Sequence, residues 1–115
     1  MKALSLLIML LHLVFCLSGL QNVWADQADE DCETGRNYYH GFGVERDYTE
    51  ALKWFRKAAH QGNAPAQNNI GAMYRHGEGV KRDYSAALKW FRKAADKGFT
   101  PSQDLLEKWS KKTGQ

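Results

Sequence analysis

The sequence predicts an all-α fold, a short right-handed α-solenoid of two helix-turn-helix repeats with a cap helix at each end. Residues 38–63 and 74–99 align at a constant offset of 36, and 18 of the 26 aligned positions are identical. Apolar residues recur at helical spacing in both copies, and a Gly-x-Gly loop precedes each of these stretches. A repeat of this length, built from two amphipathic helices, is typical of hairpins that stack side by side.

Residues 1–25 form a predicted secretory signal peptide and are separate from the fold. Met1 and Lys2 give a short positive start, and residues 3–20 are almost wholly apolar. The tripeptide Val23-Trp24-Ala25 then places small or modest side chains at the two positions that a signal peptidase reads. We expect cleavage after Ala25 and export to the periplasm or the extracellular space.

Other interpretations of this segment stay open. An uncleaved signal anchor is the main alternative, because an apolar run of 18 residues could nearly span a bilayer. It would be the chain's one link to a membrane. A lipid anchor is disfavoured, since Phe15 precedes Cys16 where a lipidation site requires a very small residue. Cleavage would leave Cys32 as the single cysteine. It could pair with a cysteine of another chain, but we favour a helix residue without a chemical role.

Charge is distributed unevenly along the predicted mature chain. Five carboxylates crowd residues 26–33, whereas residues 34–115 carry 15 basic and 8 acidic side chains, a net charge of +7. An exported protein rarely meets nucleic acid in a functional setting, so we expect no nucleic-acid partner. An anionic envelope surface or an acidic protein partner fits this basic body better, and a solvated helical face is the plainest interpretation.

Residues 26–40 align with the first helix of a repeat, although poorly. Thr34 stands where the second copy has Ile70, whereas Gly35 keeps the register of Gly71. We expect a degenerate, frayed cap helix whose acidic start is favoured by the helix dipole.

The second helix of each hairpin has the clearest signals. Asp47 begins the first of them, with Glu50 placed to complete a capping box, and Asp83 begins the second. Gly62 and Gly98 stand just past the ends, where a left-handed cap residue is needed. The apolar stripes are Tyr48, Ala51, Leu52, Phe55 and Ala59 in the first copy and Tyr84, Ala87, Leu88, Phe91 and Ala95 in the second.

A first helix is clearest in the second repeat, at about residues 64–76. Pro65 fits its first turn, and Gly71 would let another helix approach closely. The loops at residues 41–43 and 77–79 read Gly-x-Gly, and their paired glycines suggest backbone angles barred to other residues. A phosphate-binding loop is disfavoured, because no strand precedes and no Lys-Ser/Thr follows. The buried stripe of this helix is Ala66, Ile70 and Met73.

The last element is a predicted cap helix over residues 99–115. Residues 100–103 read Thr-Pro-Ser-Gln and suggest a capping box, and terminal units of arrays need a polar outer face. Its apolar stripe is Leu105, Leu106 and Trp109, and its wet face is Lys108, Lys111 and Lys112. The predicted organisation is a signal peptide at 1–25, a degenerate repeat helix at 26–40, the rest of repeat one at 41–62, repeat two at 63–98 and the cap at 99–115.

Together these residues resemble the Sel-one-like repeat, a relative of the tetratricopeptide repeat. The resemblance covers about residues 28–115. It implies a protein-protein interaction module, an adaptor for envelope or host-contact proteins. The chain has barely two units and lacks the cysteine pair that braces some exported relatives, so we expect it to self-associate or to be stabilised by a partner. The matching residues are Asn69-Ile70-Gly71-Ala72-Met73-Tyr74, Gly77-Glu78-Gly79-Val80, Asp83-Tyr84, Ala87 to Trp90, Lys93-Ala94-Ala95 and Gly98.

No catalytic residue, cofactor or metal site is predicted. His40 and His76 occupy equivalent loop positions, but lack the nearby cysteine or clustered carboxylates of a metal site. Cys32 has no third group to orient a base. Trp54 and Trp90, each flanked by Lys and Phe, could suggest a stacking platform for nucleic acid. A tryptophan that recurs with the repeat period is more often part of the core.

The surface left for function is the concave side, which the first helices of stacked hairpins line. In the second repeat the stripe opposite the core is Asn68, Ala72 and Arg75. We expect these residues to contact a protein partner whose identity the sequence does not give. Two alternatives stay open: a small exported hydrolase acting on cell-wall-like substrates, and a binder of anionic envelope surfaces that works through the basic body.

Overall fold

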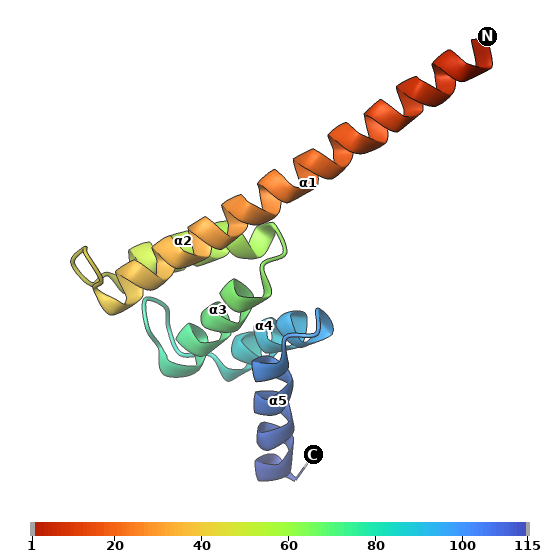
Figure 1. Cartoon of the computed structure of the whole chain (residues 1–115). Coiled ribbons are helices and arrows are strands. Elements are labelled where there is room, and N and C mark those ends of the chain that lie inside the picture. The colour runs from red at the N-terminus through yellow and green to blue at the C-terminus, as the bar shows by residue number, and fades with distance from the viewer. Residues whose placement is uncertain (1, 115) are drawn as a thin grey trace.

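The computed structural model describes the backbone of residues 2–114 and the side chains of residues 3–14 and 23–114. Its five helices follow one another along the chain, and no strand occurs among the described residues. Each hairpin pairs a first helix with the next helix along the chain, and Figure 1 shows α2 beside the C-terminal half of α1. The predicted all-α solenoid is confirmed. The helices are α1 (Lys2–His40), α2 (Tyr48–His60), α3 (Ala64–His76), α4 (Tyr84–Asp96) and α5 (Thr100–Thr113).

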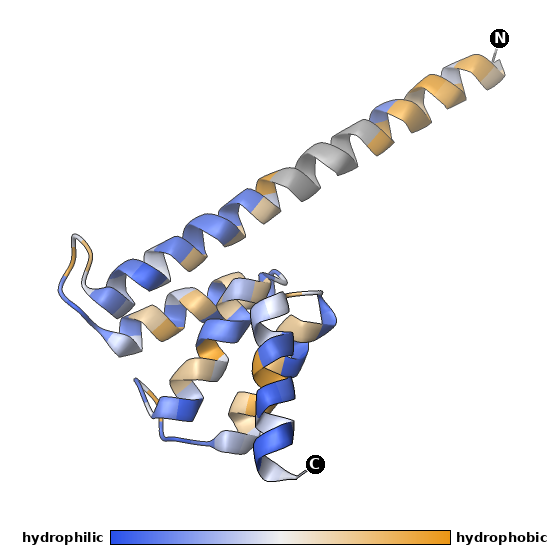
Figure 2. Cartoon of the chain, turned by 60° about the horizontal axis from the view of Figure 1, so that its bottom comes forward, coloured by the Kyte–Doolittle hydropathy of each residue, from blue (hydrophilic) through white to orange (hydrophobic). Residues whose placement is uncertain are grey.

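The N-terminal half of α1 projects away from the other helices (Figure 1). Residues 3–14 are all exposed, and Figure 2 shows the apolar stretch on this projecting part of the helix. The side chains of residues 15–22, which include Cys16 of the predicted signal peptide, lie outside the described part. Within the part that is described, no helix is both long and apolar enough to cross a bilayer.

The C-terminal half of α1 differs from the frayed cap helix that the sequence suggested. It is continuous helix that packs along α2, with Ala28 and Cys32 buried at 3% and 5% exposure. Asp31 is buried as well, at 1% exposure. Its carboxylate accepts a hydrogen bond from Gln27 and lies 3.6 Å from the Lys57 ammonium group. A helix that buries one face against its neighbour is held by packing, which outweighs its poor match to the repeat.

Both second helices begin at an aspartate, as predicted, but the expected capping box does not form. The side chains of Asp47 and Asp83 accept from the backbone N–H groups of Glu50 and Ala86, each at 3.0 Å. The reciprocal bond is missing because the N–H of Asp47 donates to the Tyr38 carbonyl at 2.9 Å. With that N–H satisfied, the Glu50 carboxylate turns to Lys53 instead.

The loop glycines adopt the left-handed backbone that the sequence indicated. Gly77 ends α3 with φ +71°, and its N–H donates to the Met73 carbonyl. Gly79 has φ +70° and lies against the preceding hairpin, where a Cβ atom would come 2.8 Å from the Tyr48 carbonyl oxygen. The loop of the second repeat therefore packs directly on the first.

Glycine and phenylalanine meet at the centre of each hairpin. A Cβ atom built on Gly35 or on Gly71 would lie 2.7 Å from the ring of Phe55 or of Phe91, respectively. Both rings are buried, at 1% and 0% exposure. The predicted close approach at Gly71 is confirmed, and it occurs in both hairpins. At the third position of this register, 36 residues further on, stands Glu107.

The core of the first hairpin is better covered than that of the second. Leu52 is 4% exposed, and Val80 and Trp90 of the following hairpin pack against the cluster that contains it. Its counterpart Leu88 is only half-buried, and Tyr84 is 51% exposed. The predicted stripes thus form a buried seam that opens at the end near α5.

The start of α5 lacks the predicted capping box. The N-cap residue is Phe99, which makes no side-chain cap bond, and Thr100 already lies inside the helix. The equivalent N-cap 36 residues earlier is Asn63, which begins α3 and whose side chain accepts from the Ala66 N–H at 2.9 Å. Ser102, which we expected within the box, is instead fully buried, and its hydroxyl donates to Asn68 at 2.8 Å.

Candidate functional site

The first helices of the hairpins, α1 and α3, and the last helix α5 frame two depressions in the surface. The first hollow, of about 410 Å³, lies between α1 and α3. The terminal groove, of about 1080 Å³, lies between α4 and α5 and is bounded by the end of α3. The first hollow is lined by Glu33, Arg36, Tyr39, His40, Phe42, Phe55, Asn69 and Ala72. The terminal groove is lined by Arg75, Tyr84, Ser85, Leu88, Pro101, Asp104, Leu105, Lys108, Trp109, Lys112 and Thr113.

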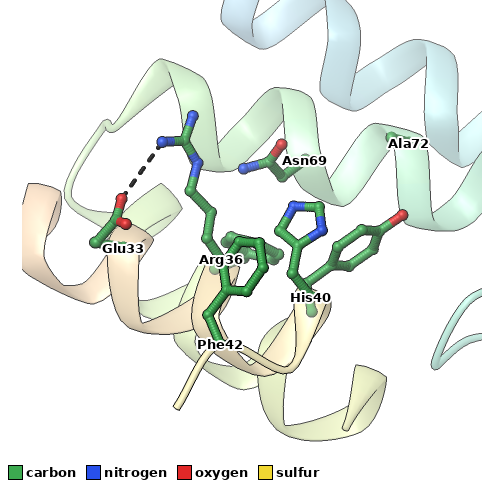
Figure 3. Close-up of a pocket in the computed structure, with 8 residues that line it drawn as sticks. Glu33, Arg36, His40, Phe42, Asn69 and Ala72 are labelled. Atoms are coloured by element: carbon green, nitrogen blue, oxygen red, sulfur yellow. Dashed lines mark hydrogen bonds and ion pairs between the residues drawn. The ribbon is translucent and has the colours of Figure 1, made fainter. Parts of the chain in front are cut away.

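The first hollow has polar walls and an aromatic rim (Figure 3). Arg36 forms an exposed ion pair with Glu33 at 3.4 Å on the α1 side. His40 stacks on Phe42, with the ring centroids 5.1 Å apart and an interplanar angle of 22°. The Phe42 ring is 64% exposed. An apolar ring held open to solvent beside charged groups can contact a protein surface without any rearrangement of the core.

A hydrogen bond from Tyr39 fixes the edge of this hollow. The Tyr39 hydroxyl donates to the Glu78 carboxylate and lies 2.9 Å from both of its oxygens. Burial, together with this bond and the carboxylate charge, raises the pKa of Tyr39 to about 12. The bond joins the end of α1 to the loop of the second repeat, so the two hairpins hold each other in position at this surface.

The terminal groove combines an apolar floor with a basic rim. Trp109 meets Tyr84 and Phe91 edge-on, with centroids 5.9 and 6.4 Å apart. The Arg75 guanidinium lies 5.3 Å above the Trp109 ring. Arg82, outside the groove lining, lies in the same way 5.5 Å above the ring of the lining residue Tyr84. Cations fixed over aromatic faces keep their charge at the groove edge while the rings remain available for apolar contacts.

The structure places the three predicted contact residues in different surroundings. Ala72 lines the first hollow and Arg75 lines the terminal groove. Asn68 lines neither, because it is half-buried and accepts the hydrogen bond of Ser102. It therefore joins α3 to α5. That these residues contact a partner stays a prediction, and they do not form one patch.

Sequence reasoning missed most of the groove. Helical spacing places Tyr84 and Leu88 in the apolar stripe of the second helix and Trp109 in the apolar stripe of the cap helix, and neither pattern indicates an open groove. The available signal was the register itself, since a second hairpin follows Leu52 and its α3 joins the same core cluster, whereas α5 alone follows Leu88 among the described residues.

The other residues considered for catalysis or ligand binding are packed among protein side chains. Burial raises the pKa of the Cys32 thiol, which keeps it protonated and weakly nucleophilic. Trp54 and Trp90 are half-buried, and the ammonium groups of Lys57 and Lys93 lie 5.0 and 4.5 Å from their ring centroids. Among the described residues, no group of three or more His, Cys, Asp or Glu side chains is placed to hold a metal ion.

Comparison with known proteins gives matches to a family of repeat proteins. The family model "Sel1 repeat" matches residues 32–63 and 64–99. A crystal structure of a protective antigen from uropathogenic Escherichia coli strains, described as displaying an SLR fold, is 39% identical with a TM-score of 0.69. A Sel1 repeat protein from Oxalobacter formigenes is 37% identical with a TM-score of 0.64. A search of curated proteins found no match.

These alignments cover 73% and 65% of this chain, but only 18% and 31% of the two solved chains. The chain thus spans about a fifth to a third of the length of the structures that it resembles.

Proposed function

This chain belongs to the Sel1 repeat family, and on that premise we propose that it is an exported adaptor whose hairpins present the first hollow and the terminal groove to a protein partner. The Sel1 repeat fold is generally a non-catalytic interaction scaffold. The proposal accordingly assigns the chain a binding role and no reaction.

The observation that carries the proposal is the aromatic and apolar surface left open on a well-packed scaffold. Phe42 and Tyr84 are 64% and 51% exposed, although the core rings of Phe55 and Phe91 are buried at 1% and 0% exposure. Exposed aromatic residues set among charged ones are typical of protein contact sites. The Tyr39–Glu78 bond and the glycine contacts hold the two hairpins in fixed positions, so such a surface would bind with little loss of flexibility.

Export is supported by the N-terminal pattern and by the separation of that segment from the core. The apolar residues 3–14 are exposed and extend away from the hairpins. Removal of residues 1–25 would therefore leave the packed part of α1, which includes Ala28 and Asp31, in place. N-terminal sequencing of the chain purified from an exporting bacterium tests this point. A first residue of Asp26 is expected, and retention of Met1 in the membrane fraction would favour the signal-anchor alternative.

The adaptor role is tested by capture of partners with the tagged chain, followed by mass spectrometry. We expect Ala72→Glu and Arg75→Glu to lose partners that the wild-type chain retains, because both residues line the proposed surface. Arg92→Glu is the matched control, since Arg92 is exposed on α4 and lines neither depression. Equal recovery of every partner by all three variants would contradict the proposal, and so would turnover of a cell-wall-like substrate by the purified chain.

A further inference from the structure

The terminal groove is the place where a further hairpin would pack. The core cluster that contains Leu52 extends from the first hairpin into α3 of the second, and Val80 and Trp90 pack against this cluster. In the second hairpin the equivalent Leu88 lies in the open groove beside Trp109. A surface shaped by the repeat to receive a helical element is thus left without one among the described residues.

A second helix of this chain's own type does not fit well beside α5. Each hairpin of the chain closes with a phenylalanine ring against a glycine, at 2.7 Å from the Cβ position. On α5 that position is Glu107, whose carboxylate is 65% exposed and pairs with Lys111. The second helices α2 and α4 also carry basic outer faces, with Lys53, Lys57 and their counterparts.

The rim of the groove selects for the opposite charge. Three cationic side chains, Arg75, Lys108 and Lys112, line it against the single carboxylate of Asp104. The ion pairs found among the described side chains join Arg36 to Glu33, Lys53 to Glu50, Lys57 to Asp31 and Lys111 to Glu107, so none neutralises a groove residue. A rim with more positive than negative charge around an apolar floor is complementary to an apolar segment with acidic edges.

We propose that the terminal groove docks an amphipathic helix of a partner protein whose apolar face meets Leu88 and Trp109 and whose acidic edges meet Arg75, Lys108 and Lys112. This inference rests on the proposed adaptor function and names the partner chemistry for one of its two depressions. Helix-in-groove binding buries one apolar stripe, and the flanking charges decide between partners.

The probe is a fluorescein-labelled model helix with leucine and alanine on one face and glutamate on the other. Its control is the same helix with lysine in place of glutamate. Binding to the chain, produced in a host with an intact export pathway, is measured by fluorescence anisotropy at low and at high salt. We expect the acidic helix to bind at least about tenfold more tightly than the lysine helix, with an affinity that falls as salt rises.

Two double variants separate the groove from general charge. Lys108→Glu with Lys112→Glu reverses the groove rim and should weaken binding of the acidic helix about tenfold or more. Lys89→Glu with Lys111→Glu makes the same change in net charge at exposed residues outside the groove and should leave binding unchanged. In an NMR titration, the Trp109 indole N–H should shift while that of Trp54 stays in place. Circular dichroism establishes that both variants remain folded.

Equal binding of the two probe helices, or equal losses in the two double variants, would overturn the inference. A dimer of the chain in analytical ultracentrifugation that dissociates only when the rim is reversed would overturn it too, because the occupant would then be a second copy. If partner capture still depends on Ala72 while the groove variants bind normally, the adaptor function stands and the groove assignment alone is wrong.

Discussion

The Tyr39 hydroxyl lies 2.9 Å from both carboxylate oxygens of Glu78, and this bond joins α1 to the loop that follows α3. The two residues are 39 positions apart in the chain, so the bond links one hairpin to the next. A phenol that donates to a carboxylate makes a charge-assisted bond, which is stronger than one between neutral groups.

We expect Tyr39→Phe to lower the free energy of unfolding by about 1 kcal/mol, because the substitution removes this bond and leaves Glu78 to water. Urea unfolding followed by circular dichroism measures the change. Tyr38→Phe is the control, since Tyr38 packs on the core without a recorded side-chain hydrogen bond among the described residues. A loss of stability as large in the control would mean that the hydroxyl of Tyr39 contributes nothing specific.

The raised pKa of Tyr39 predicts a pH dependence of stability. The folded state holds the neutral phenol, with a pKa of about 12 against an ordinary value of 10.0. A raised folded pKa means that the contribution is fully present below the unfolded value and is lost as pH rises through the folded value. Stability attributable to Tyr39 should therefore disappear between about pH 10 and pH 12. Ultraviolet titration of tyrosinate should show late-titrating absorbance that Tyr39→Phe removes.

Gly71→Ala should destabilise the chain by about 1–3 kcal/mol, because the new methyl group would overlap the Phe91 ring. The sign is diagnostic, since alanine in place of glycine inside a helix ordinarily stabilises by about 0.5–1 kcal/mol. Thermal unfolding measures the effect. In the Phe91→Leu background, Gly71→Ala should lower the stability by less than it does in the wild-type chain, because the smaller side chain leaves room for the new methyl group. If the effects of the two substitutions were strictly additive, the contact would not be the cause.

Asp31→Ala should lower the free energy of unfolding by about 2 kcal/mol, because the buried carboxylate bonds Gln27 and Gln61 and pairs with Lys57. Denaturant unfolding of this variant is compared with that of Asp26→Ala, which removes an exposed carboxylate from the same acidic segment. Equal stability of the two variants would show that the network between α1 and α2 contributes little.

The repeat made the helices predictable, whereas the ends of the array were harder to predict. Apolar spacing, the capping aspartates and the loop glycines are local features, and the helix predicted at about residues 64–76 is observed as Ala64–His76. The capping boxes were wrong for reasons that lie outside the local sequence. The N–H of Asp47 finds a carbonyl on α1, and the N-cap of α5 falls one residue earlier than the Thr100 motif suggests.

The candidate site was only partly predictable because exposure depends on what lies next in space. Ala72 and Arg75 were identified from the helical stripe, and both line depressions. Asn68 belongs to the same stripe, but its side chain accepts a hydrogen bond from Ser102. Periodicity does not reveal this contact between α3 and α5. Tyr84 and Leu88 share a pattern with buried residues, and only the three-dimensional arrangement shows that they are open.

Glu107 affects where further repeat units can be added to such a protein. A second helix added behind α5 would bring its phenylalanine against a charged side chain, whereas the first helices α1 and α3 each offer it a glycine. A duplicate of residues 64–99 inserted between Asn63 and Ala64 would meet compatible neighbours on both sides. The Glu107 side chain would stay on the last helix. Evolution or engineering can therefore add units in the interior of this array more readily than at its C-terminal edge.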